Sequence, residues 1–412
     1  MRKKELLSPA GNFEKMCAAF LYGADAVYLA SQKFGMRAAA QNFDKKEMNA
    51  AIDYAHNIGK KVYVAINVMP RGYEYRELRA YLRSFKKNPP DAFIVADLGV
   101  FCTVKEILPE VDIHISTQAS ICSAATAKAW YDLGAKRVVL ARELTLDEVK
   151  EIRKNTPKAL ELEAFIHGSM CVSYSGRCLL SNHYTKRDAN RGMCAQPCRW
   201  DFTERDMAFS EIKRPDDILT AHQDSRGTYI MSSKDMCMIE HIPELMESGI
   251  DSFKIEGRMK SAYYASVVTN AYRMAIDEYI KKGDEGYRYD PRWLCELESV
   301  SHREYATGYW FDRVCDNAQL CENPGYIREK AYIATAIDYD EQTSYATFVQ
   351  RNKVSEGEMV ELITPNMCGR AFTVEHIYDE GGQQIPSAPH PAMKFKIKVP
   401  FKVKAGDIIR GV

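Results

Sequence analysis

Four cysteines lie within 28 residues of this chain, close enough in sequence for their thiolates to hold one metal centre together. They are Cys171, Cys178, Cys194 and Cys198, and their spacing is C-x6-C-x15-C-x3-C. None of these intervals is the C-x2-C pair that most structural zinc sites use. An iron–sulfur cluster is wider than one zinc ion and accepts looser spacing, so the pattern favours a cluster. A zinc site and a set of ordinary buried thiols are the two alternatives.

The elements that must position these cysteines alternate between strands and helices. Eight short apolar or β-branched segments, most of them followed by a stretch of helical period, predict parallel strands at 5–8, 26–29, 61–68, 92–96, 113–116, 137–140, 161–166 and 252–255. This order predicts a (β/α)8 TIM-barrel-like catalytic domain. An open doubly wound sheet is the runner-up, but the turn after the first strand, Pro9-Ala10-Gly11-Asn12, lacks the glycine-rich phosphate fingerprint.

The pattern changes near residue 327, where alternating apolar and polar residues begin. Runs at 332–337, 345–349, 358–363, 372–377 and 394–399 are separated by turn residues. We therefore predict a catalytic domain over 1–326, with a cysteine-rich insertion at about 168–227, and a small C-terminal all-β barrel domain over 327–412. In a barrel this insertion would lie at the C-terminal face of the strands, where active sites form.

Composition limits where the chain acts. No run of about 18 apolar residues is present, so no membrane partner is expected. The N-terminus lacks the apolar stretch of a signal peptide, which predicts a cytoplasmic protein whose 12 cysteines are not a disulfide framework. Basic and acidic residues number 56 each, so contact with nucleic acid must come from local patches.

Several motifs together resemble one known family. They are ELLSPAGNFEKMCAAFLYGADAVYLA at the start, Ser116-Thr-Gln-Ala-Ser120, HGSMCVSYSGRCLLS and SFKIEGRMKS. Over essentially the whole chain they resemble the collagenase-like peptidase family U-32. The segment GMCAQPCRW and the β domain resemble the branch of that family that hydroxylates the wobble uridine of tRNA.

The resemblance implies an oxygen-independent tRNA uridine 5-hydroxylase with prephenate as hydroxyl donor and a 4Fe-4S cluster. It assigns the cluster to the four cysteines above, with Cys237 as a rival to Cys198 because some relatives take a ligand from further downstream. The implied partners are the tRNA anticodon loop and, since some relatives work in pairs, a paralogous subunit. Alternatives are a collagenase-like peptidase and a hydroxylase of ribosomal RNA or a quinone precursor. A thiol peptidase at Cys171 would exclude that sulfur from the cluster.

A dicarboxylate such as prephenate needs cations at the barrel mouth, and arginine binds carboxylates best. The candidate substrate-binding residues follow or lie in predicted strands: Arg258, Arg142, Lys254, Glu256, Gln118, His114 and Asn67. Ion pairs within the motifs, Arg142 with Glu143 or Arg258 with Glu256, are the structural alternative. His167 and Glu163 are the candidate catalytic acid–base residues, and packing roles are the alternative for both.

Two basic patches are candidates for RNA binding. The first lies in the cysteine segment, where Lys186, Arg187, Arg191 and Arg199 alternate with aromatic residues. The second is Lys394, Lys396 and Lys398, which alternate with apolar residues on one strand. The alternative for this second patch is a basic strand face that prevents pairing at a sheet edge.

Overall fold

The computed structural model describes residues 4–35, 42–171, 174, 178, 180–185, 187, 193–197, 208–211, 214–220, 222–224, 227–229, 233–311, 327 and 330–412. The chain divides into two compact units. The first comprises Met1–Met16, Asp25–Lys260 and His302–Tyr326, and the second comprises Cys17–Ala24, Ser261–Ser301 and Ile327–Val412. None of the helices in the described part of the chain is both long enough and apolar enough to span a bilayer.

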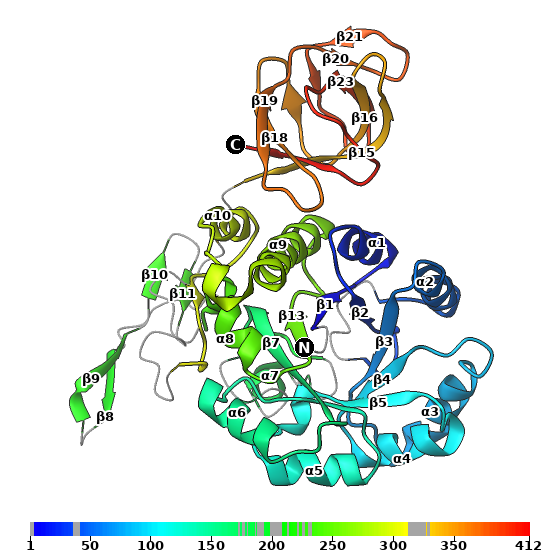
Figure 1. Ribbon diagram of the computed structural model, residues 1–412, viewed down its shortest axis with the longest axis vertical. Coiled ribbons are helices and arrows are strands. Elements are labelled where there is room, and N and C mark those ends of the chain that lie inside the picture. Colours follow the sequence, from blue (N-terminus) through cyan, green and yellow to red (C-terminus); the bar gives the residue numbers. More distant parts are fainter. Residues whose placement is uncertain are drawn as a thin grey trace. The chain divides into compact units, whose positions relative to one another are not determined.

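The first unit contains a closed barrel of eight parallel strands (Figure 1). Each strand pairs with the next in sequence, and β13 closes the ring by pairing with both β1 and β7. The strands are β1 Glu5–Pro9, β2 Ala26–Leu29, β3 Lys61–Ile66, β4 Ala92–Val95, β5 Asp112–Ile115, β6 Arg137–Val139, β7 Glu161–Ser169 and β13 Ser252–Ile255. The closed ring confirms the predicted TIM-barrel-like fold and rules out the open sheet.

Helices connect these strands and lie around the barrel in Figure 1. They are α1 Phe13–Leu21, which crosses from the first unit into the second, α2 Lys45–Asn57, α3 Tyr75–Arg83, α4 Leu98–Ile107, α5 Ala124–Asp132, α6 Leu146–Lys154 and α8 Ile242–Glu247. Polar caps fix where several begin. The predicted capping box of Thr145 and Glu148 is present at α6, and Asp44 with Glu47 forms another at α2. These caps set the points at which the chain turns back from the barrel mouth.

The connection between β7 and β13 is long and holds the cysteine segment. Its described elements are α7 Leu180–Thr185, β8 Ala208–Glu211, β9 Arg214–Thr220, β10 His222–Asp224, β11 Gly227–Tyr229 and β12 Asp235–Cys237. Strand β7 continues past the barrel, and its last three residues pair antiparallel with β12, which in turn pairs with β14 Tyr305–Ala306. The insertion is therefore tied back to the strand from which it leaves.

The second unit combines helices α9 Ala262–Gly286 and α10 Arg292–Glu298 with an antiparallel half-barrel sheet. The sheet order is β19-β18-β24-β15-β16-β23-β20-β21. Its strands are β15 Tyr332–Asp340, β16 Tyr345–Gln350, β18 Met359–Ile363, β19 Arg370–Thr373, β20 Ile377–Tyr378, β21 Gln384–Ile385, β23 Lys394–Lys398 and β24 Ile408–Gly411; the short β17 Val354–Ser355 and β22 Ser387–Ala388 pair separately. The predicted all-β domain is present in this unit.

One predicted strand is wrong in detail. The run 372–377 is not continuous, because β19 ends at Thr373 and β20 begins at Ile377. Val374 between them is buried, so the apolar spacing reflects core packing across a turn. The strand β24, which pairs with both β15 and β18, was missed because its residues give no clear alternation.

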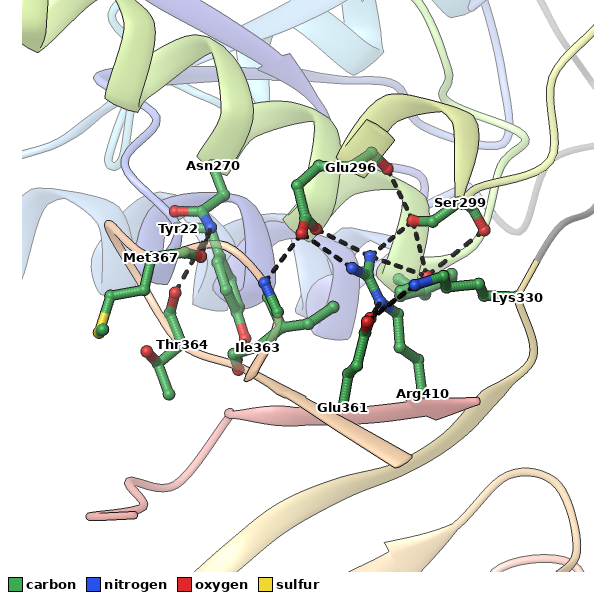
Figure 2. A network of polar contacts seen from close by, with 12 residues as sticks. Tyr22, Asn270, Glu296, Ser299, Lys330, Glu361, Ile363, Thr364, Met367 and Arg410 are labelled. Atoms are coloured by element: carbon green, nitrogen blue, oxygen red, sulfur yellow. Dashed lines mark hydrogen bonds and ion pairs between the residues drawn. The ribbon is translucent and has the colours of Figure 1, made fainter. Parts of the chain in front are cut away.

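Buried charges join the sheet to the helices within the second unit (Figure 2). The guanidinium of Arg410 on β24 donates two hydrogen bonds of 2.8 Å to Glu296 on α10 and one of 2.6 Å to Glu361 on β18. Arg410 is 2% exposed, so these contacts are well shielded from water. Asn270 on α9 adds a second link, since its amide contacts the backbone of Asn366 and Met367.

We predict that Arg410→Met lowers the free energy of unfolding of this unit by about 3 kcal/mol, because it leaves Glu296 buried without its cation. Glu361 keeps its ion pair with Lys330. Arg292→Met is the matched control, since Arg292 pairs with Asp290 on the surface and surface pairs contribute less than about 1 kcal/mol. Denaturant titration of both variants measures the difference. Equal losses would contradict the role of Arg410.

Candidate functional site

A cavity opens among the carboxyl ends of the barrel strands. The residues that line it come from seven of the eight strands or the turns that follow them: Tyr28, Ala65, Asn67, Ile94, Ser116, Thr117, Gln118, Arg142, Phe165, Cys171, Lys254, Glu256 and Arg258. Six of the seven predicted substrate-binding residues are in this lining, so the barrel brings them together; only His114 is not.

The turn after β13 forms one wall of the cavity, and two glycines let it lie there. A Cβ atom on Gly11 would come within 2.3 Å of the carbonyl oxygen of Arg258. A Cβ atom on Gly168, whose φ is +103°, would come equally close to the carbonyl oxygen of Glu256. Both contacts are far inside van der Waals distance, so neither position accepts a side chain without a shift of the turn. The glycines of two sequence motifs thus fix the backbone that carries Glu256 and Arg258.

Three cations and one carboxylate meet in this cavity. Arg142 donates a 2.7 Å hydrogen bond to the carbonyl oxygen of Ser169 and lies 4.0 Å from Glu256. Its guanidinium also stacks over the Phe165 ring at 3.9 Å. The alternative pairing of Arg142 with Glu143 is therefore replaced by contacts with β7 and with the turn after β13. With Lys254 and Arg258 in the same lining, positive charge exceeds negative charge.

Tyr28 is a site residue that the sequence analysis missed. Its hydroxyl lies 3.1 Å from both Glu256 Oε2 and the carbonyl oxygen of Ile255, which share its one proton. Burial and the neighbouring Glu256 raise the pKa of Tyr28 well above its ordinary value, so the hydroxyl keeps its proton. The Lys254 ammonium lies 4.6 Å from the centre of the Tyr28 ring. The only signal in the sequence was an aromatic residue at an inward position of the second strand.

Neutral polar groups complete the lining opposite these charges. Asn67 donates to the hydroxyl of Ser116 at 3.4 Å, and Ser116 caps the short turn that carries Gln118. Gln118 is 5% exposed, and its Oε1 atom has no hydrogen-bond partner among the described residues. A buried amide oxygen without a partner is costly, so this atom is available to a ligand hydroxyl or amine.

Glu163 lies below the cavity and is not in its described lining. Its carboxylate is fully buried and accepts 2.7 Å and 2.8 Å hydrogen bonds from Lys254 and Arg137. Arg137 also contacts Glu5 at 2.6 Å and Glu161 at 2.8 Å, which forms a charge network inside the barrel. This geometry makes Glu163 a positioning residue for the Lys254 ammonium; the catalytic role proposed from the sequence stays a prediction.

His114 also lies deep in the barrel rather than in the cavity lining. Its ring packs edge-on against Tyr63 at 4.6 Å, and its Nδ1 atom has no hydrogen-bond partner in the described structure. Burial, and then the positive charges of Arg137 and Lys254, hold the pKa of His114 well below its ordinary value. The imidazole is therefore neutral in the folded protein.

His167 lies on the extension of β7 and is outside the described lining of the cavity. It faces Cys237 of β12 across the sheet, and its ring packs against Tyr305 at 5.4 Å. Burial lowers the pKa of His167 to about 3, so the ring is neutral near pH 7. The acid–base role predicted for His167 would require a substrate to reach the extension of β7, where it pairs with β12.

The described cysteines fit a metal centre by their chemistry. Cys171 lines the cavity, and Cys171, Cys178 and Cys194 are half-buried and form no disulfide. The backbone N–H of Gln196 donates to the Cys194 sulfur at 3.4 Å, a contact that stabilises thiolates bound to iron. Among the described residues no three side chains lie close enough to hold a metal ion. Cys198 lies outside these residues, so the choice between Cys198 and Cys237 stays a prediction.

The candidate RNA-binding residues fall in both units. In the cysteine segment, Arg187 is exposed and follows α7, while Lys186, Arg191 and Arg199 lie outside the described residues. Tyr174 and Tyr184 in the same segment are 46% and 54% exposed. In the second unit, the lysines predicted on the last basic strand lie on β23, and all three are exposed.

We predict that His114 makes the free energy of unfolding fall more steeply as the pH is lowered than it would without this histidine. The unfolded chain binds a proton at this histidine below about pH 6.5, whereas the folded protein does not. The stability present above pH 6.5 is therefore lost as pH falls, by up to about 1.4 kcal/mol per pH unit. Denaturant titrations between pH 7.5 and 5 should show a shallower slope for His114→Phe. An unchanged slope would contradict the depressed pKa, whatever the variant's absolute stability.

Comparison with known proteins gives matches over both units. Residues 11–319 match the model described as Peptidase family U32, and residues 328–410 match that of the Peptidase family U32 C-terminal domain. The tRNA hydroxylation protein P1 of Bacillus subtilis (strain 168) is 36% identical, with 99% of this chain and 95% of the relative covered. The tRNA hydroxylation protein P of Escherichia coli (strain K12) is 35% identical, with 97% and 94% covered. The 23S rRNA 5-hydroxycytidine C2501 synthase of the same strain is 35% identical, with 78% and 47% covered.

Proposed function

Since the chain belongs to peptidase family U32, we propose that it hydroxylates RNA, and specifically the wobble uridine of tRNA at C5. The proposed hydroxyl donor is prephenate, and the reaction does not use oxygen. Two relatives that match almost the whole chain carry tRNA hydroxylation in their names, which supports a tRNA substrate. The observation that carries the proposal is the cavity at the barrel mouth, where three cations and a cysteine of the predicted cluster converge.

The cavity suits a small dicarboxylate with a hydroxyl group. Arg142 and Arg258 offer planar donors that bind carboxylates in a bidentate manner, and Lys254 adds a third cation at the floor. The free Oε1 atom of Gln118 would accept the donor's hydroxyl proton. Glu256 would repel a ligand carboxylate, but Arg142 lies 4.0 Å from it and the Tyr28 hydroxyl donates a hydrogen bond to it.

A 4Fe-4S cluster held by Cys171, Cys178, Cys194 and either Cys198 or Cys237 would supply electron transfer or an iron site for the donor. The protein's own contribution is to place Cys171 in the cavity lining, with Arg142 in the same wall. A peptidase would instead need Cys171 as a free nucleophile with a base beside it. The described lining of the cavity contains no histidine, and His167 lies on the extension of β7. The redox interpretation therefore accounts for more of the site.

Anaerobic purification tests the cluster first. We expect a brown protein with about four irons and four sulfides per chain, and we expect Cys171→Ala to remove the colour and the modification together. Cys198→Ala and Cys237→Ala decide the fourth ligand, because only the ligand's variant should lose iron. Cys102→Ala, at an exposed thiol on α4, is the control. A colourless wild-type protein that cleaves peptides under the same conditions would sink the proposal.

An activity assay tests the substrates. The purified chain, prephenate and unmodified tRNA should yield 5-hydroxyuridine by mass spectrometry of nucleosides, and the chain alone should suffice unless a paralogous subunit is required. Arg258→Gln should raise the KM for prephenate at least tenfold, because it removes a carboxylate donor. Lys15→Gln, near Gly11 but outside the described lining, is the control. Activity on ribosomal RNA fragments but not on tRNA would move the assignment to the ribosomal branch.

A further inference from the structure

The outer face of β16, β23 and β20 carries a row of three lysines. Lys394, Lys396 and Lys398 are exposed, and they alternate with Phe395 and Ile397 in the core. Strand β23 is not an edge, since β16 pairs along the whole of one side and β20 pairs with Lys396 and Ile397 on the other (Figure 1). Protection of a sheet edge, the alternative raised by the sequence, therefore does not explain these lysines.

The three lysines of the row have exposed carboxylates near them, but these do not pair with every lysine. Alternate residues of a strand lie about 6.6 Å apart on the same face, so the three ammonium groups repel one another. Lys394 lies 3.8 Å from the exposed Glu380, and Lys396 interacts with Asp340. No acidic partner of Lys398 is found in the described residues. Exposed pairs of this kind neutralise little, so an anion that binds along the row would relieve the repulsion.

Two tyrosines lie across the same row. Tyr345 on β16 is opposite Lys398, and Tyr378 on β20 is opposite Lys396. Their ring centres are 5.7 Å apart at an interplanar angle of 75°, and both side chains are half-buried. The two rings therefore meet above β23, between cations, and each keeps part of its surface in solvent.

We propose that this lysine–tyrosine face, formed by Lys394, Lys396, Lys398, Tyr345 and Tyr378, binds unpaired RNA. Ammonium groups contact the backbone phosphates, and the half-exposed rings stack on bases that are not paired. A duplex could use the lysines but would leave the rings without partners, because its bases stack on each other. The inference rests on the proposed function and names the part of the RNA that the second unit takes: a loop or a single strand.

The test measures binding of the full-length protein to two fluorescent RNAs, an anticodon stem-loop and a fully paired duplex, by anisotropy at several salt concentrations. Tyr378→Leu should weaken stem-loop binding about tenfold and leave duplex binding unchanged. Tyr378→Phe keeps the ring and should restore stem-loop binding. Lys396→Gln should weaken both RNAs and reduce the salt slope by about one. Lys353→Gln, an exposed lysine in a turn of the same sheet domain, is the matched control.

The outcomes separate this inference from the proposed function. Stem-loop binding that is unchanged in Tyr345→Leu and Tyr378→Leu, with tRNA modification intact in both, overturns the lysine–tyrosine face alone. Absence of RNA binding and of modification in the wild-type protein overturns both proposals. If a leucine variant unfolds at a lower temperature than the wild-type protein, RNA binding by Lys396→Gln still tests the proposal, because the exposed Lys396 side chain is not needed for folding. An effect no larger than that of Lys353→Gln would contradict the proposal.

Discussion

The cavity at the barrel mouth depends on one buried carboxylate, Glu163, which bridges Lys254 and Arg137. A buried charge is costly unless it is paired and hydrogen-bonded, and here each oxygen receives a cationic donor. Arg137 is in turn held by Glu5 and Glu161. Although burial alone would raise the pKa of Glu5, the Arg137 guanidinium brings it below its ordinary value, so the network stays ionised at neutral pH. The interior of this barrel thus stabilises the position of a cation instead of forming a purely apolar core.

The same constraint explains why the cavity wall is built from a tight turn. The Lys254 ammonium at the floor of the cavity can help to bind a ligand only if the hydrogen-bond donors in the wall are also held in fixed positions around that ligand. The turn after β13 supplies them, and it can approach β1 and β7 only because Gly11 and Gly168 have no side chains. The charge network inside the barrel fixes the Lys254 ammonium, and the two glycines fix the turn after β13. Both are needed to shape the cavity.

The sequence predicted the barrel because eight short apolar runs alternate with stretches of helical period. The same reasoning placed Asn67, Gln118 and Arg142 in one cavity, since they follow predicted strands and the ends of parallel strands share one face. The sequence did not show which way side chains point inside the barrel. Glu163 and His167 lie four residues apart on β7, yet Glu163 faces the interior charge network and His167 contacts β12 and β14. The irregularity in pairing between Phe165 and His167 causes this change, and such a bulge leaves no clear mark in the sequence.

The second unit shows the same use of buried charge for a different purpose. Arg410 and Asn270 join the sheet to α10 and α9 through directional hydrogen bonds. Within this unit the sheet is therefore held in a fixed position against the two helices. Apolar packing alone would allow several arrangements of similar energy, whereas a buried guanidinium between two carboxylates accepts only one. A face that binds RNA on β16, β20 and β23 would therefore move together with α9 and α10.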